Sequence, residues 1–162
     1  MSYDTLEVRI DERGVASVAL NLPERRNALS AALSEDLTAA AHALGGSKAV
    51  RAVVLSGAGK VFCAGGDLNW MTAQIKADRA TRIAEARKLA LMLNALNEMP
   101  KPLIGRIHGA AIGGGIGLAC VCDSVIADEA TRFGLTETRL GLIPATIGPY
   151  VIARMGEGKA RR

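Results

Sequence analysis

Hydrophobic and polar residues alternate near the start of the chain, and later short runs are continuously apolar. Alternation is typical of half-buried strands, and continuous β-branched runs are typical of buried ones. Strands are predicted by these patterns at residues 6–11, 15–22, 50–56, 103–108, 124–127 and around Phe133. The polar residues 11–14, which end in glycine, predict that the first two strands form a hairpin.

Apolar residues recur at helical spacing in the segments between these strands. Helices are expected at residues 30–44, 67–98, 113–120 and from about 145 onward. Ser30 is a suitable N-cap for the first. The apolar stripe of the second helix consists of Ile83, Ala86, Ala90, Leu93 and Leu96. Its first half, residues 72–82, is polar and is predicted to be mobile or to cover a binding pocket. The repeated order strand, strand, helix predicts an α/β fold with short strands.

Composition and charge narrow the class of protein. The 162 residues suit a single domain, and the net charge is +4. Residues 151–162 carry four basic side chains against Glu157, a net of +3, which leaves +1 for the rest. With 3% aromatic residues and no basic face along the fold, nucleic acid is not an expected partner. Three cysteines, a polar N-terminus and no long apolar run predict a reduced, cytoplasmic protein without a membrane span.

Two small-residue segments follow predicted strands and open predicted helices. They are residues 61–68, which include Gly65, Gly66 and Asp67, and residues 109–117, which include three consecutive glycines. Such segments let a ligand approach the backbone and its N–H groups. The alternatives are a tight loop with an Asp cap for the first, and close helix packing or a weak dinucleotide fingerprint for the second.

One acidic side chain stands out because of its surroundings. Glu137 lies between apolar and glycine-rich stretches, where a carboxyl group can be partly desolvated and act as a general acid and base. The alternative is a solvated surface residue. His108, His42 and Asp123 are interpreted as structural or exposed, and Cys120 and Cys122 lack the further ligands of a zinc site, so no metal is expected.

Taken in order, residues 21–29, 62–68, 111–123 and 133–144 resemble the enoyl-CoA hydratase/isomerase (crotonase) family. The resemblance implies a spiral of repeated ββα units that binds a bent acyl-CoA, which is substrate and not cofactor. It implies that the N–H groups of Ala64 and Gly114 form an oxyanion hole for the thioester enolate, with Glu137 as the catalytic acid and base. The other substrate-binding residues would be Arg26, Ala28, Cys63, Gly65, Gly66, Asp67, Leu68, Gly113 and Gly117.

The chain departs from the two-carboxylate hydratases of that family, because Gly117 stands where they carry a second Glu. The leading hypothesis is a lyase that adds water to an enoyl-CoA. The closest likeness is to bacterial methylglutaconyl-CoA hydratases, which suggests a branched or carboxylated acyl group. Alternatives are a Δ3,Δ2-enoyl-CoA isomerase with the same single acid, a non-catalytic acyl-CoA-binding fragment and, more remotely, a nucleotide-binding domain.

The resemblance also bears on length and assembly. Family members continue into a C-terminal helical part that builds trimers, so residues 1–162 are expected to be the N-terminal core domain of a longer protein. Apolar residues on the last predicted helix, Tyr150, Val151, Ile152 and Met155, indicate association through this end. The full-length protein is expected to be a homo-oligomer, a trimer or a dimer of trimers.

Overall fold

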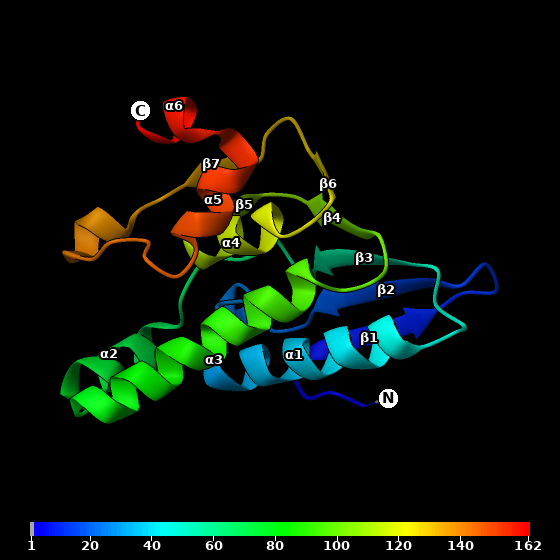
Figure 1. Cartoon of the computed structure of the whole chain (residues 1–162), viewed down its shortest axis with the longest axis horizontal. Helices are drawn as coiled ribbons and strands as arrows, with labels where there is room; N and C mark the ends of the chain where they lie inside the picture. The colour runs from blue at the N-terminus through cyan, green and yellow to red at the C-terminus, as the bar shows by residue number, and fades with distance from the viewer. Residues whose placement is uncertain (1) are drawn as a thin grey trace.

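The computed structural model describes residues 2–162, and its central feature is a five-stranded sheet in the order β1-β2-β3-β4-β6 (Figure 1). The strands are β1 (Leu6–Ile10), β2 (Val15–Leu20), β3 (Ala52–Gly57), β4 (Leu103–Ile107) and β6 (Ser124–Ala127). The β1–β2 hairpin is antiparallel and all other pairs are parallel. Residues of β2 alternate in burial, as the sequence pattern predicted.

A second, smaller sheet pairs β5 (Ala110–Ile112) with β7 (Arg132–Gly134) in parallel. Two isolated parallel bridges continue this layer, Leu29 with Gly66 and Cys63 with Ala111. Successive segments of the chain therefore place a strand in the main sheet, then a short extended stretch in the second layer, and then a helix. The predicted α/β spiral of repeated ββα units is confirmed.

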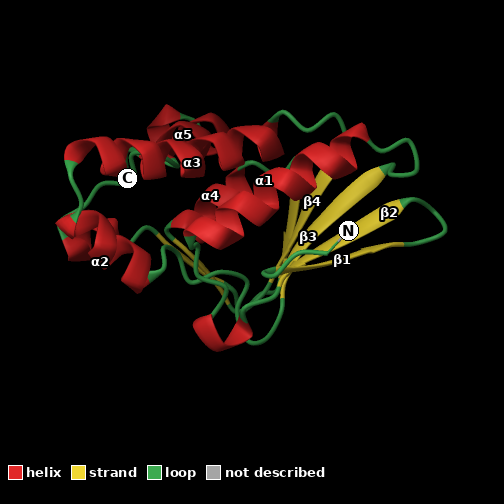
Figure 2. Ribbon diagram, turned by 90° about the horizontal axis from the view of Figure 1, so that it is seen from below, coloured by secondary structure: helices red, strands yellow, loops and turns green. Residues whose placement is uncertain are grey.

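Helices cover one face of the main sheet (Figure 2). Among them are α1 (Ala31–Gly46), α3 (Arg79–Asn97), α4 (Gly114–Cys120) and α5 (Gly148–Met155). The other helical segments of the described residues are η1 (Pro23–Arg25), α2 (Leu68–Lys76), η2 (Glu137–Leu140) and α6 (Glu157–Ala160). The predicted cap of α1 is confirmed, because Ser30 Oγ accepts a hydrogen bond from Leu33 N at 3.2 Å.

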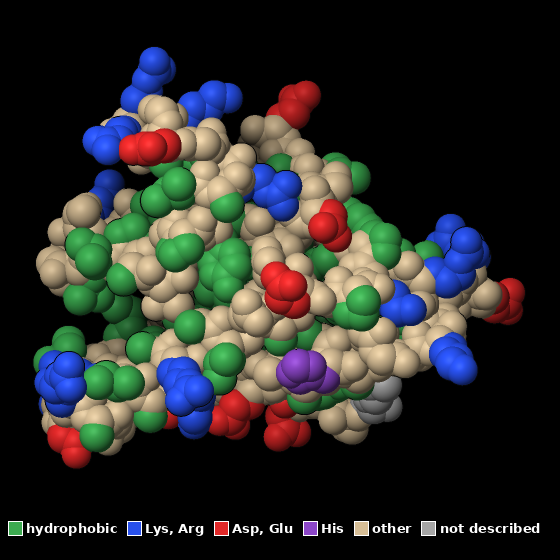
Figure 3. All heavy atoms as spheres, in the orientation of Figure 1, with side chains coloured by type: hydrophobic (Ala, Val, Ile, Leu, Met, Phe, Trp, Pro, Cys, Tyr) green, Lys and Arg blue, Asp and Glu red, His purple; other side chains and the backbone are tan. Residues whose placement is uncertain are grey.

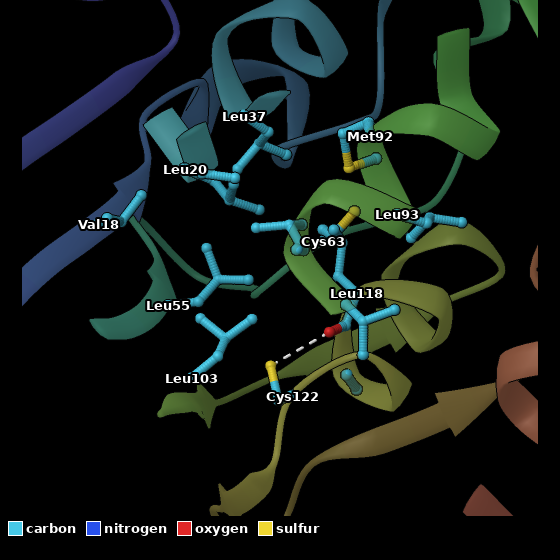
Figure 4. Packing of buried hydrophobic residues seen from close by; sticks show 14 of the residues in the cluster. Val18, Leu20, Leu37, Leu55, Cys63, Met92, Leu93, Leu103, Leu118 and Cys122 are labelled. Carbon is cyan, nitrogen blue, oxygen red and sulfur yellow. Dashed lines mark hydrogen bonds between the residues drawn. The ribbon is translucent and has the colours of Figure 1, made fainter. Parts of the chain in front are cut away.

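The core between helices and sheet is almost wholly aliphatic (Figure 4). Leu37 of α1, Leu55 of β3, Leu93 of α3 and Leu118 of α4 are each at most 1% exposed. Burial of an aliphatic side chain of this size stabilises the fold by about 1.5–3 kcal/mol. This core fixes the helices against the sheet, and through them the loops that follow each strand.

The single helix predicted at 67–98 is in fact two. α2 ends at Lys76, and α3 begins after Asp78, whose carboxylate accepts a hydrogen bond from Thr81 N at 2.7 Å. An Asp at this point starts a new helix by capping its free N–H groups. The prediction for the stripe is correct only for its second half: Leu93 and Leu96 are buried, whereas Ile83 is exposed. The reason is that α2 and the start of α3 project beyond α1 (Figure 1).

The polar residues interpreted as structural have that role. His108 Nε2 lies 2.9 Å from the Gly59 carbonyl oxygen, and Asp123 accepts a hydrogen bond from Leu103 N at 2.7 Å. Arg154 is more than part of a solvated basic end. Its guanidinium donates to the carbonyls of Cys120, Cys122 and Asp123, and so fastens α5 to the last turn of α4.

Two possible features are missing from residues 2–162. None of the helices in this range is long and apolar enough to cross a membrane. The same residues contain no group of three or more His, Cys, Asp or Glu side chains arranged to hold a metal ion.

Candidate active site

A cavity of about 370 Å³ opens between the two small-residue segments, the α2–α3 pair and residues 136–147. This volume is in the range of small-molecule sites. Most of the lining is apolar, and it includes Leu29, Leu68, Met71, Ala86, Leu89, Leu140, Leu142, Ile143 and Ile147. The polar part consists of backbone at Gly65, Gly66, Gly113 and Gly114 and the side chains of Ser30, Ser34, Trp70, Thr136, Glu137 and Thr146.

The two small-residue segments lie against each other, backbone to backbone. Cys63 N donates to Ala110 O at 3.1 Å, and Ile112 N donates to Cys63 O at 3.0 Å. A Cβ added to Gly115 would lie 2.7 Å from Cys63 O, closer than a side chain permits. Glycine here allows close packing of the segments, and that packing brings both helix starts to one end of the cavity.

The prediction that the N–H of Ala64 is an oxyanion-hole donor is wrong. Its N–H already donates to the carbonyl oxygen of Arg26 at 3.0 Å, so it is not free to bind a substrate oxygen. A sequence cannot reveal this, because the acceptor lies 38 positions earlier and is brought to Ala64 by the left-handed turn at Arg26 and Asn27.

The N–H of Gly66 is free where that of Ala64 is not. Leu29 pairs with one side of the extended residues 65–67. Its N–H donates to Gly65 O at 2.7 Å, and its carbonyl accepts from Asp67 N at 2.9 Å. In a parallel bridge the intervening residue directs its own N–H to the opposite side. Gly66 and Gly114 both line the cavity, and neither N–H donates to an acceptor within the described residues.

Glu137 faces the same end of the cavity. Its Oε1 lies 3.0 Å from the position that a Cβ would take on Gly113, so the carboxylate sits over the glycine turn that opens α4. Gly113 has a φ of +49°, which is a second reason for glycine. The other oxygen, Oε2, is buried and has no hydrogen-bond partner in residues 2–162. An unpaired buried carboxylate oxygen is costly, which points to a role with a ligand.

Four of the predicted substrate-binding residues line the cavity: Gly65, Gly66, Leu68 and Gly113. Five do not: Arg26, Ala28, Cys63, Asp67 and Gly117. Cys63 is fully buried in the core, and burial raises the pKa of its thiol to about 12. Asp67 caps α2 by accepting from Trp70 N at 2.9 Å. Arg26 is exposed and does not line the cavity, although its carbonyl oxygen accepts from Ala64, which does, so a contact of its side chain with CoA stays a prediction.

Gly117 is absent from the lining because Ile147 covers it. A Cβ on Gly117 would overlap the Cγ2 atom of Ile147, which is buried at the start of α5 and itself lines the cavity. The place where a second carboxylate was considered is thus filled by an aliphatic side chain. The polar residues 72–82 were expected at the pocket, yet none of them lines it; Leu68, Trp70 and Met71 take that place.

Sequence reasoning missed Asn27, which supports the site from behind. The side chain is fully buried, and its Oδ1 accepts from Leu22 N at 2.9 Å. Its Nδ2 donates to the carbonyls of Ala58, Val61 and Phe62 at 2.9–3.1 Å. Asn27 therefore ties η1 to the loop that leads into Gly65 and Gly66. The residue type alone gives a weak signal: Asn tolerates a positive φ, and the structure shows a positive φ at Asn27.

Comparison with known proteins agrees with this geometry. The family model described as enoyl-CoA hydratase/isomerase matches residues 11–162. The chain belongs to the enoyl-CoA hydratase/isomerase family. A putative enoyl-CoA hydratase of Thermus thermophilus is 36% identical over 154 residues, which are 95% of this chain and 61% of that protein. A probable enoyl-CoA hydratase of Rhizobium meliloti is 38% identical over 164 residues, 99% of this chain and 60% of that protein.

Solved structures give the same result. The crystal structure of an enoyl-CoA hydratase from Shewanella pealeana is similar to this family member with a TM-score of 0.94 and 38% identity. It is matched over 98% of this chain and 59% of its own. The chain thus spans about three fifths of the length of these relatives, so activity, substrate and assembly of the whole protein are matters for proposal.

Proposed function

We propose that the protein is an enoyl-CoA hydratase, a lyase that adds water across the α,β double bond of an acyl-CoA thioester. One observation carries this proposal. Glu137, whose buried Oε2 has no hydrogen-bond partner, lines the same cavity as Gly66 and Gly114, whose N–H groups are unbonded. A carboxylate can move protons there, while two fixed N–H donors bind an oxygen that becomes negative.

The chemistry needs only these groups. Glu137 takes a proton from water, and the oxygen of that water bonds to the β carbon. The electron pair of the double bond moves onto the thioester, whose oxygen becomes an enolate held by the N–H groups of Gly66 and Gly114. Glu137 then returns a proton to the α carbon, which restores the carboxylate and the thioester. Acyl-CoA is the substrate, and the proposed reaction requires no cofactor.

Isomerisation is the second candidate, and Ile147 favours it. Because Ile147 covers Gly117, Glu137 is the only carboxylate among the described residues that line the cavity. A single acid suffices to move a proton between the α and γ carbons of a Δ3-enoyl-CoA. Assays of the purified protein with crotonyl-CoA for hydration and with trans-3-hexenoyl-CoA for isomerisation distinguish the two reactions. If the full-length protein catalyses neither reaction, the non-catalytic acyl-CoA-binding alternative is the one that remains.

Gly114→Pro is expected to lower kcat about 10²–10³-fold, the usual effect of losing one oxyanion donor. Proline has no N–H, and the first position of a helix tolerates it well. Gly114→Ala is the matched control because it keeps the N–H. Its added Cβ would lie 2.5 Å from Leu29 Cδ1, the end of a flexible side chain that can shift. Equal rates of the Pro and Ala variants in the crotonyl-CoA assay would contradict a role for this N–H.

An uncharged acyl group fits the cavity better than a carboxylated one. Glu137 is the only formally charged side chain of the described lining, and it is negative. We expect valeryl-CoA to bind at least about tenfold more tightly than glutaryl-CoA, since a second carboxylate would be desolvated near a like charge. These saturated thioesters have equal chain length and cannot be hydrated, so calorimetry measures binding alone. Tighter binding of glutaryl-CoA would instead support the methylglutaconyl-type substrate.

Association through the C-terminal side is also expected. Exposed apolar side chains gather near α5, namely Val125, Phe133, Leu135, Ile152 and Met155. Figure 3 shows hydrophobic side chains at the surface beside the basic C-terminal end. Patches of this kind mark interfaces. Light scattering of the full-length protein should give a trimer or a multiple of it, whereas a stable monomer would refute this expectation.

A cytoplasmic location stays a prediction from the three free cysteines.

A further inference from the structure

The hydrogen bond between Trp70 and Glu85 joins α2 to α3 beside the cavity. Trp70 Nε1 donates to Glu85 Oε2 at 3.0 Å. α2 contains no fully buried residue, so little packing holds it. Among residues 2–162, this is the only side-chain hydrogen bond that links a residue of α2 to another helix or strand. Besides the packing of its half-buried residues Trp70, Met71 and Gln74, this contact is what fixes α2 to α3.

Glu85 is itself held on its other side. Lys88 Nζ lies 3.0 Å from Glu85 Oε1 and 3.1 Å from Glu35 Oε1 of α1. These three charged side chains become less exposed from Glu35 to Glu85. The exposed fraction of the side chain is 60% for Glu35, 47% for Lys88 and 18% for Glu85. The hydrogen bond from Trp70, followed by that from Lys88, lowers the pKa of Glu85. Glu85 is therefore an ionised acceptor at neutral pH.

The indole that Glu85 holds forms part of the cavity wall. Trp70 and Met71 of α2 line the cavity together with Ala86 and Leu89 of α3. Ala86 adjoins Glu85 in sequence, so the indole is fastened at the edge of the apolar part of the cavity. Trp70 is the largest side chain in the lining, and a change in its orientation alters the space there more than a change in any other lining residue.

We propose that Glu85 is a positioning residue for acyl selectivity: it holds Trp70 against the cavity and thereby limits the acyl groups that fit. This inference rests on the proposed function, because it assigns the apolar part of the cavity to the acyl group. Glu85 does not line the cavity and acts through Trp70. Its loss leaves Glu137 and the N–H groups of Gly66 and Gly114 in place.

The expected result separates positioning from chemistry. Glu85→Ala should raise KM for crotonyl-CoA about 3- to 10-fold, because the apolar wall is no longer held against a short acyl group. kcat should stay within about twofold, since uniform binding is lost and not an interaction specific to the transition state. KM for substrates with longer acyl groups should rise less. The ratio of kcat/KM for crotonyl-CoA to that for 2-decenoyl-CoA should therefore fall by about the same factor.

Fluorescence provides a readout that needs no turnover, because Trp70 is the only tryptophan of the chain. In Glu85→Ala the emission should shift to the red and acrylamide should quench it more strongly. Titration with butyryl-CoA, which cannot be hydrated, should change the emission of the wild type beyond the change caused by free CoA. If the protein does not hydrate crotonyl-CoA but shows these emission changes, the proposed function is refuted and the placement of Trp70 beside the acyl group is supported.

Three variants complete the experiment. Glu85→Gln keeps an oxygen acceptor for the indole and should restore most of the emission and selectivity. Glu35→Gln breaks only the exposed outer ion pair and should resemble the wild type, as exposed pairs contribute little. Trp70→Phe keeps an aromatic ring but loses the donor, so it should show the same loss of selectivity as Glu85→Ala. This variant also decides the matter if Glu85→Ala fails to fold.

Two results would overturn the inference. One is wild-type emission, quenching and acyl selectivity in Glu85→Ala. The other is a fall in kcat of the same size for short and long substrates in both Glu85→Ala and Trp70→Phe, which would mean that the contact supports the fold in general and does not select the acyl group.

Discussion

Glu137→Gln is expected to reduce kcat about 10²–10⁴-fold, the usual contribution of general acid–base catalysis. The amide preserves the shape of the side chain over Gly113 but cannot exchange a proton with water and the α carbon. KM for crotonyl-CoA should change little, because the N–H groups of Gly66 and Gly114 and the apolar wall are intact. The measurement is the loss of the conjugated thioester absorbance under steady-state conditions.

Glu129→Gln is the matched control, since Glu129 is exposed in the preceding turn and has no place in the cavity. It should hydrate at the wild-type rate. Wild-type rates of both hydration and isomerisation in Glu137→Gln would show that Glu137 is structural. Loss of isomerisation, in a protein whose wild type never hydrates any enoyl-CoA, would select the isomerase.

Asn27→Ala should lower the free energy of unfolding by about 3–5 kcal/mol, because it leaves one N–H and three carbonyls, all buried or partly buried, without this partner. The loop that carries Gly65 and Gly66 would lose its support, so residual activity should fall as well. Urea denaturation followed by circular dichroism measures the first effect. Asn94→Ala, at an exposed position of α3, should change stability by no more than about 0.5 kcal/mol.

Asn27→Asp refines the interpretation. A carboxylate still accepts from Leu22 N but cannot donate to the carbonyls of Ala58, Val61 and Phe62. It should be at least as destabilising as alanine, because a buried charge would face three carbonyl oxygens. An Asp variant as stable as the wild type would mean that these three donations contribute nothing to the fold.

Local patterns were sufficient for most of the architecture. Alternation in β2 and the Ser30 cap of α1 were predicted correctly, because each depends on neighbours within a few residues. The break at Asp78 was missed because it lies in the polar residues 72–82, where no apolar periodicity marks the end of one helix or the start of the next, although an Asp in a polar run is a possible cap. Ile83 was placed in the core because periodicity identifies an apolar face but not whether another element covers it.

The site was predicted less completely, for a different reason. Glu137 and Gly114 stand in motifs whose residues are adjacent in sequence. The availability of an N–H depends on partners far away in the chain, and Arg26 takes the one at Ala64 while leaving that of Gly66. Ile147 over Gly117 and Glu85 behind Trp70 are likewise contacts between elements, which no spacing within one segment reveals.

The two proposed donors belong to the main chain, on neighbouring segments joined by the Cys63–Ala111 bridge. Their separation is thus governed by backbone pairing, which requires glycine at Gly115 and is otherwise set by the spacing of extended segments. Of all single substitutions at Gly66 or Gly114, only proline deletes a donor outright. Almost any substitution of Glu137, by contrast, removes its carboxylate. As sequences diverge, the half of this site that polarises the thioester should therefore persist long after the acid and the acyl wall have changed, so that one scaffold can acquire new reactions without rebuilding its anion-binding centre.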